Sequence, residues 1–116
     1  MCELLWSDPE DINDWAENPR GAGVIFGTQL VEKFLNINRV GLIVRAHQLI
    51  MEGFRKQFND KLITVWSAPN YCYRCQNKAS IMKLGGNLDS NFIIFEASKE
   101  DYKPPPKKKD LPEYFL

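Results

Sequence analysis

Two cysteines at C-x-x-C spacing are the most visible chemical signal of this sequence, in the stretch SAPNYCYRC at 67–75. Cys72 and Cys75 could ligate zinc, form a redox-active disulfide, or pack as small soft side chains. Structural zinc needs a second pair of ligands, and only Cys2 and His47 are left as soft ligands. A thioredoxin-like pair begins a helix, whereas KASIMKL follows here and favours a strand. Packing is the commonest role, with zinc and redox chemistry as the alternatives.

A single histidine and one arginine have settings that suit a binding site. His47 follows the apolar run LIVRA, so we expect it at a strand end, where functional side chains collect. The alternative is a buried histidine bonded to backbone, and one histidine cannot alone hold a metal ion that needs about four ligands. Arg20 lies in NPRGAG, where small neighbours leave room for a planar guanidinium to meet a phosphate or carboxylate. The alternative is a surface arginine in a turn.

Composition limits the classes of protein to consider. The chain has 116 residues, enough for one domain, and its 15 basic and 15 acidic residues balance. That balance gives no argument for nucleic acid or a membrane surface, and the apolar runs are too short to span a bilayer. Three cysteines without a visible secretory signal predict reduced thiols in the cytoplasm or nucleus.

The elements that must position these residues can be read from periodicity. The first twenty residues are acidic and rich in turn signals, which predicts a loop. Residues 27–38 carry apolar side chains at helical spacing, with Thr28 as N-cap. Four short apolar runs predict strands, the first two of them buried: 40–47, 61–68, 79–84 and 91–97. Such a pattern favours sheets packed on one another with at least one helix beside them.

From Lys99 the composition changes. KEDYKPPPKKKDLPEYFL is charged and contains three consecutive prolines, which favour an extended, solvated tail over 99–116. The tail nonetheless ends in YFL, three apolar residues.

Three separated motifs together resemble the phosphoprotein phosphatase family of serine/threonine phosphatases. They are LLWSDPED…PRGAG, RAHQLIMEG and WSAPNYCYRC, and the likeness covers nearly the whole chain apart from 99–111. CYRC and the terminal YFL are similar to the type 2A-like branch, nearest the phosphatase-4 and phosphatase-6 subgroup. The resemblance implies that residues 1–98 are the C-terminal part of a metallophosphatase catalytic domain. Its fold class would be α/β (α+β), a β-sandwich flanked by helices.

The resemblance also implies a role for each candidate residue. In this family two divalent metal ions, manganese or iron with zinc, activate a water that attacks phosphorus. His47 matches a ligand of one metal, and Arg20 matches the arginine that grips the substrate phosphate. Tyr71 matches a tyrosine beside the metal centre, and Cys72 and Cys75 match a loop that lines the substrate and inhibitor groove. By this analogy the cysteine pair shapes a groove and is not itself a metal site.

The sequence departs from the family pattern at several points. Gln76 stands where glycine is usual, so a positive φ there would cost about 1 kcal/mol or more. Val24 stands where an aromatic residue is usual. In the type 2A-like branch the tail docks scaffold and regulatory subunits, and a leucine carboxyl methyltransferase modifies the last residue; Tyr114 and Leu116 match that pattern.

The family's G-D-x-H-G, G-D-x-V-D-R-G and G-N-H-E motifs, which supply most metal ligands, do not occur in these 116 residues. We therefore expect a protein serine/threonine phosphatase acting on phosphoproteins, whose chain as given lacks part of the domain and is inactive alone. An alternative is a non-catalytic chain that binds phosphatase scaffold or regulatory subunits through its tail. A third is an unrelated small metal- or redox-binding protein, which leaves PRGAG and RAHQ unexplained.

Overall fold

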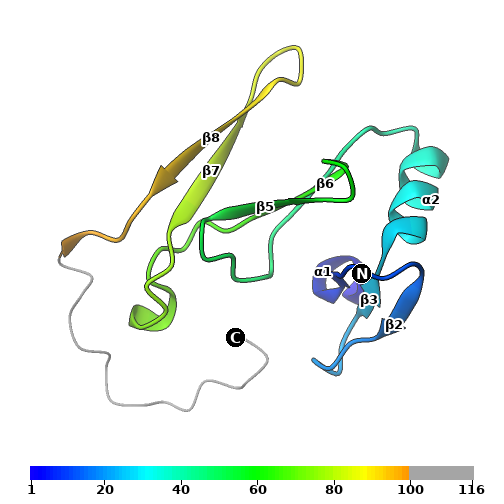
Figure 1. Cartoon of the computed structure of the whole chain (residues 1–116), viewed down its shortest axis with the longest axis horizontal. Helices are drawn as coiled ribbons and strands as arrows, with labels where there is room; N and C mark the ends of the chain where they lie inside the picture. Colours follow the sequence, from blue (N-terminus) through cyan, green and yellow to red (C-terminus); the bar gives the residue numbers. More distant parts are fainter. Residues whose placement is uncertain (100–116) are drawn as a thin grey trace. The chain divides into compact units, whose positions relative to one another are not determined.

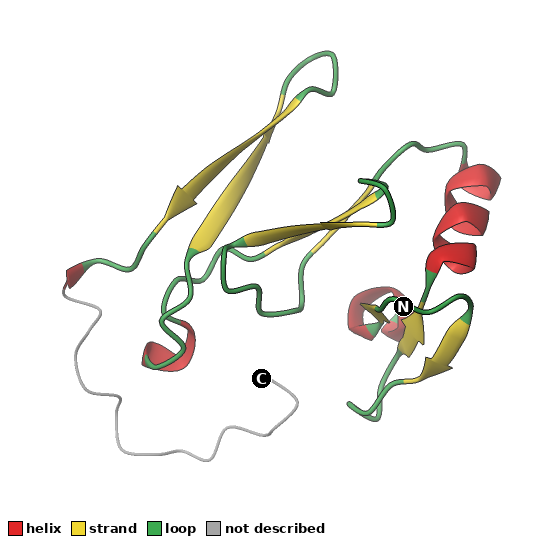
Figure 2. Cartoon of the chain, viewed as in Figure 1, coloured by secondary structure: helices red, strands yellow, loops and turns green. Residues whose placement is uncertain are grey.

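A computed structural model describes residues 1–99, which belong to two compact units (Figure 1). The first unit comprises residues 1–47 and 56–63; the second comprises 48–55 and the described residues from 64 on. Figure 2 distinguishes their helices from their strands. In chain order the elements are α1 Cys2–Trp6, β1 Asp8–Pro9, β2 Trp15–Glu17, β3 Val24–Phe26, α2 Thr28–Asn38, β4 Ile43–Arg45, β5 Phe54–Gln57, β6 Leu62–Val65, the 3-10 helix η1 Tyr71–Tyr73, β7 Ala79–Leu84 and β8 Ser90–Phe95.

A small mixed sheet organises the start of the first unit. Its strand order is β1-β3-β2, with β1 parallel to β3 at Asp8 opposite Ile25 and β2 antiparallel at Trp15 opposite Phe26. The prediction of a loop over the first twenty residues was therefore wrong. Strands of two or three residues are too short to show a period of two, so turn signals dominate the sequence pattern.

The predicted helix at 27–38 is confirmed as α2, but Thr28 is not its N-cap. Gly27 is the cap residue, and no side chain caps the helix. Backbone amides of residues 27, 28 and 29 instead donate to carbonyls of the loop at residues 12–14, over 2.7–3.0 Å. A Cβ on Gly27 would overlap the Ile12 carbonyl, so only glycine permits this close approach. The cap is thus a tertiary contact that no local sequence motif predicts.

The core of the first unit lies between α2 and the strand β6. Val31 and Leu35, four residues apart on α2, pack on Leu62, and all three are buried. Three half-buried apolar side chains complete the cluster: Phe26, Ile43 and Phe58. Glu32 and Lys61 form an ion pair at 2.5 Å on the outside of the same contact. The helical spacing seen in the sequence is therefore the spacing that builds this core.

A three-stranded sheet with the order β4-β6-β5 follows along the chain. The prediction of a buried strand at 61–68 is confirmed for β6, which is buried over Leu62, Ile63 and Thr64. The strand predicted at 40–47 shrinks to the three residues of β4, and Val44 within it is exposed, so its predicted burial was wrong. The strand β5 has the sequence FRKQ, whose charged residues hide it from a search for apolar runs.

The second unit is built on the hairpin of β7 and β8. The strands pair antiparallel from Ala79 opposite Phe95 to Leu84 opposite Ser90, close to the two predicted runs. Phe54 and Phe92 stack face to face, with ring centroids 3.8 Å apart. The buried Ser80 hydroxyl donates to the carbonyl of Gly53 at 2.6 Å. These two contacts join the hairpin to the start of β5 within this unit.

Helices and sheets of mixed and antiparallel type confirm the predicted α+β class. Over residues 1–99, no helix combines the length and apolar character that crossing a bilayer requires. The predicted tail lies outside the described residues from residue 100 on.

Candidate functional site

One buried carboxylate gathers the polar side chains of the first unit. Asp8, at the start of β1, is 5% exposed. Its Oδ2 accepts hydrogen bonds from Arg20 Nε at 2.6 Å and from Asn18 Nδ2 at 2.9 Å. Its Oδ1 accepts from Arg45 Nη2 at 3.1 Å. Asp8 therefore holds the guanidinium groups of two arginines that are 25 residues apart in the sequence.

The backbone around Arg20 is fixed as firmly as its side chain. Asn18 is buried, and its Oδ1 accepts from the Arg20 amide at 2.9 Å while its Nδ2 also reaches the Trp6 carbonyl at 3.3 Å. Gly23 has a φ of +69°, and a Cβ there would lie 2.6 Å from the Trp6 carbonyl carbon. The sequence NPRGAG therefore places its arginine through an Asx-type turn and a glycine that no larger residue could replace.

The electrostatics of this cluster favour an anion. Burial alone would raise the pKa of Asp8, but hydrogen bonds from Asn18 and Arg20 and the arginine charges outweigh it, and the pKa is lowered. Burial lowers the pKa of Arg45, and the Asp8 carboxylate partly offsets that effect. One negative and two positive groups leave a net charge of about +1 in a largely buried cluster. A phosphate oxygen would find compensating charge there.

His47 lies two residues after β4 in a strained conformation, with a φ of +79°. Its ring packs edge to face on Trp6, with centroids 5.1 Å apart. Burial lowers the pKa of His47, the charges of Arg20 and Arg45 lower it further, and Asp8 opposes them. The imidazole is therefore neutral at pH 7, which is the form that ligates metals.

The Nε2 atom of His47 tests whether a metal would fit. It is buried and has no hydrogen-bond partner among residues 1–99, as expected of a nitrogen that awaits a ligand. Within the same residues, no group of three or more His, Cys, Asp and Glu side chains could hold an ion. The described chain thus fits one position in a metal coordination shell and supplies no complete site. The predicted backbone partner for the histidine is not found at this nitrogen.

The second unit contains the SAPNYCYRC loop. Tyr71 starts the 3-10 helix η1, and Cys72 within it has a φ of +56°. Asn77 is buried and holds the loop, because its Oδ1 accepts from the Tyr71 amide at 2.8 Å and its Nδ2 donates to the Ala68 carbonyl at 2.9 Å. Trp66 packs edge to face on the Tyr71 ring at 4.8 Å. A backbone with several left-handed residues is thus held in one shape by an asparagine outside the motif.

The chemistry of this loop rests on a phenol and two thiols. Burial raises the pKa of Tyr71, and the neighbouring Cys72 and Cys75 raise it further, so the phenol is protonated at neutral pH. Both cysteines are free and half-buried. Gln76 has a φ of +54°. The residue that stands where glycine is usual therefore has the positive φ that strains a residue with a Cβ.

The structure distributes the predicted site residues over both units. Arg20 and His47 belong to the first unit, and Tyr71, Cys72 and Cys75 belong to the second. Tyr114 and Leu116 lie outside the described residues.

Sequence analysis missed Asp8, Asn18 and Arg45. A signal existed for Arg45, since a charged residue inside the apolar run LIVRA needs a buried partner. Asp8 and Asn18 each precede a proline and count among the turn signals of the first twenty residues. Nothing in their local pattern separates a turn residue from a buried ligand of an arginine.

Comparison with solved structures gives an informative likeness. No family model matches this chain. A solved structure of a protein serine/threonine phosphatase from Saccharomyces cerevisiae, described as similar to human phosphatase PP5, superposes with a TM-score of 0.75. Its sequence is 31% identical, and the match covers 84% of this chain but 34% of the yeast chain, about a third of its length. The chain therefore carries part of a serine/threonine phosphoprotein phosphatase fold.

Proposed function

We propose that this chain contributes phosphate-binding and metal-binding residues to a protein serine/threonine phosphatase. The observation that supports this most is the Asp8 cluster, in which two guanidinium groups share one buried carboxylate. Their excess positive charge acts on His47, whose buried Nε2 has no partner in residues 1–99. An anion subsite combined with an orphan imidazole nitrogen is what a metal-dependent phosphatase needs from this part of its domain.

Each residue then has a defined task in the hydrolysis of phosphoserine or phosphothreonine. Arg20 binds and orients the phosphoryl oxygens, and Asp8 keeps its guanidinium in place. His47 presents a neutral imidazole to one of two divalent ions, manganese or iron with zinc. Those ions, when bound, supply the activated water and charge compensation. Tyr71 offers a protonated phenol as a hydrogen-bond donor, and Cys72 and Cys75 shape the groove beside it.

The finer assignment is also part of this proposal. The CYRC sequence and the terminal YFL support the type 2A-like branch, nearest phosphatase-4 and phosphatase-6. Scaffold and regulatory subunits and a leucine carboxyl methyltransferase are then the partners of the C-terminal residues, with Tyr114 in the docking sequence and Leu116 as the methylation site. The cytoplasm and nucleus are the compartments that reduced cysteines support.

A chimera tests the proposal most directly. This chain would replace the matching third of the yeast phosphatase, and manganese-dependent hydrolysis of a phosphopeptide would be measured. We expect activity in the chimera and no hydrolysis by the pure chain. Arg20→Ala should lower kcat/KM about 100- to 1,000-fold, as expected when a donor to transition-state charge is removed. His47→Ala should lower the manganese content, measured by elemental analysis.

Arg55→Ala is the matched control, because Arg55 is exposed and lies outside the cluster. It should change kcat/KM less than about twofold. A folded, metal-loaded chimera without activity would contradict the proposal, as would equal activity in the Arg20→Ala and Arg55→Ala variants. Hydrolysis by the pure chain would contradict the expectation that it is inactive alone.

A further inference from the structure

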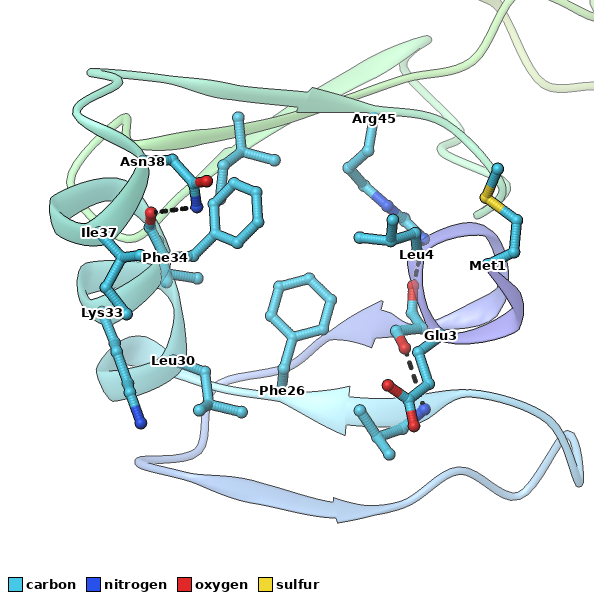
Figure 3. Close-up of a pocket in the computed structure, with 14 residues that line it drawn as sticks. Met1, Glu3, Leu4, Phe26, Leu30, Lys33, Phe34, Ile37, Asn38 and Arg45 are labelled. Atoms are coloured by element: carbon cyan, nitrogen blue, oxygen red, sulfur yellow. Dashed lines mark hydrogen bonds between the residues drawn. The ribbon is translucent and has the colours of Figure 1, made fainter.

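An apolar groove of about 640 Å³ opens in the first unit, between α2 and α1 (Figure 3). Phe26 projects from β3 into its centre, and side chains of α2 form one wall. Most of its lining is apolar, including Leu4, Val24, Phe26, Leu30, Phe34 and Ile37. Glu32, whose ion pair with Lys61 lies on the outside of the helix contact, does not line the groove, whereas Val31 of the core cluster does.

Large apolar side chains continue out of the groove onto the surface. The exposed fraction is 74% for Leu4, 69% for Ile37 and 44% for Phe34. A folded monomer seldom exposes such a continuous apolar patch, and burying it against a partner would gain roughly 25 cal/mol per Å². The face therefore has the character of an interface.

The polar groups of the groove are already engaged or lie at its edge. Asn38 Nδ2 donates to the Phe34 carbonyl at 2.8 Å, and Arg45 Nη2 donates to the Ser7 carbonyl at 2.8 Å. Glu3 and Lys33 lie on opposite sides of the opening (Figure 3). A small ligand would find few polar groups to orient it, and it would leave the exposed rim uncovered. A polypeptide with an apolar face covers both groove and rim.

We propose that this groove docks the part of a phosphatase catalytic domain that the present chain does not span. The inference rests on the proposed function. Its support is the comparison: 84% of this chain superposes on the yeast phosphatase, while about two thirds of that protein's length has no counterpart here. A part of a single fold buries its apolar faces against the remainder, since one domain shares one core. The groove is an apolar face that residues of the first unit offer for such packing.

The docking test uses the full 116-residue chain and a purified segment of the yeast phosphatase domain that excludes the matched third. Sedimentation velocity and calorimetry should detect a one-to-one complex. Ile37→Asp and Phe34→Asp should each weaken it at least tenfold, because a carboxylate would be buried without a partner. Asn36→Asp, which adds the same charge on α2 outside the groove, should change the affinity less than about twofold.

A second measurement keeps the inference testable if the yeast segment does not fold alone. Placed in the chimera, Ile37→Asp should lower the melting temperature by several degrees, whereas Asn36→Asp should leave it within a degree. Equal effects of the two substitutions would overturn the inference. So would a stable dimer of this chain that Ile37→Asp dissociates, which would assign the groove to a second copy.

The outcomes separate this inference from the proposed function. An active chimera in which Ile37→Asp and Asn36→Asp behave alike would refute the docking surface and leave the phosphatase proposal standing. A tight complex that Ile37→Asp disrupts, combined with an inactive and metal-loaded chimera, would support docking and refute the phosphatase proposal.

Discussion

At the scale of single residues, Asp8 holds the candidate site together, although Arg20 is the residue that the sequence pattern indicates most clearly. The Asp8 carboxylate accepts hydrogen bonds from Asn18, Arg20 and Arg45. Removing one partner of a buried charged pair is strongly destabilising, because the other charge is left uncompensated. The same carboxylate therefore controls both the stability of this unit and the orientation of the Arg20 guanidinium.

The first prediction concerns pH. The pKa of Asp8 lies below its ordinary value of 3.8, so the unfolded chain binds more protons between these two values. The contribution of Asp8 to stability is thus present above about pH 4 and is lost as the pH falls through the folded-state pKa. As the pH is lowered from 5 to 2.5, the free energy of unfolding, measured with urea, should fall less steeply in Asp8→Asn than in the wild type. Asp11→Asn, at an exposed carboxylate, should keep the wild-type slope.

Gln76 gives the second prediction at this scale. Its φ of +54° strains any residue with a Cβ, and its side chain is exposed. Gln76→Gly should raise the free energy of unfolding by about 0.5–1 kcal/mol, since relief of strain exceeds the added entropy of the unfolded chain. Gln57→Gly, at a strand position without positive φ, should lower it. A loss of stability in both variants would show that the loop is unstrained at residue 76.

At the scale of elements, the cap of α2 decides how the helix is attached. Three amides at its N-terminus donate to carbonyls of residues 12–14, and Gly27 permits their approach. Gly27→Ala should destabilise the first unit by about 1–3 kcal/mol, because either the loop or the helix must move. Gly41→Ala is the control, since no atom lies within 4 Å of the Cβ it would add. Urea unfolding followed by circular dichroism at 222 nm measures both, and equal stabilities would contradict the tertiary cap.

The sequence predicted best the longer elements, in which apolar residues recur along the chain. The helix α2 buries a regular face, with Val31 and Leu35 four residues apart. The six-residue hairpin strands β7 and β8 were found as runs rich in apolar residues, although much of their surface is exposed. The strands β1, β2, β3 and β5 were not predicted because they are short or charged. The candidate site divides in the same way. Arg20 lies in the local motif NPRGAG and His47 follows the apolar run LIVRA, so both could be found from the sequence. Asp8 gains its partners only through the parallel pairing of β1 with β3.

At the scale of the whole molecule, two compact units each carry part of the predicted site. The first unit holds the Asp8 cluster and His47, and the second holds the loop of Tyr71. The fold is similar to about a third of the length of a known phosphatase. Sequence motifs alone could indicate the family because they are local. They could not indicate the apolar groove, because its lining comes from α1, β3, α2 and β4, and only the folded structure brings these separate elements together.

The capped end of α2 has one more consequence. A free helix N-terminus attracts anions through its unpaired amides, but here loop carbonyls already occupy those amides. A phosphate held by this unit would therefore depend on the full charges of guanidinium groups and gain little from backbone dipoles. Mobile counterions compete with such charges, and at 0.15 M salt they screen beyond about 8 Å. Phosphopeptide affinity in the chimera should therefore fall as potassium chloride is raised, and chloride itself should act as a weak competitor.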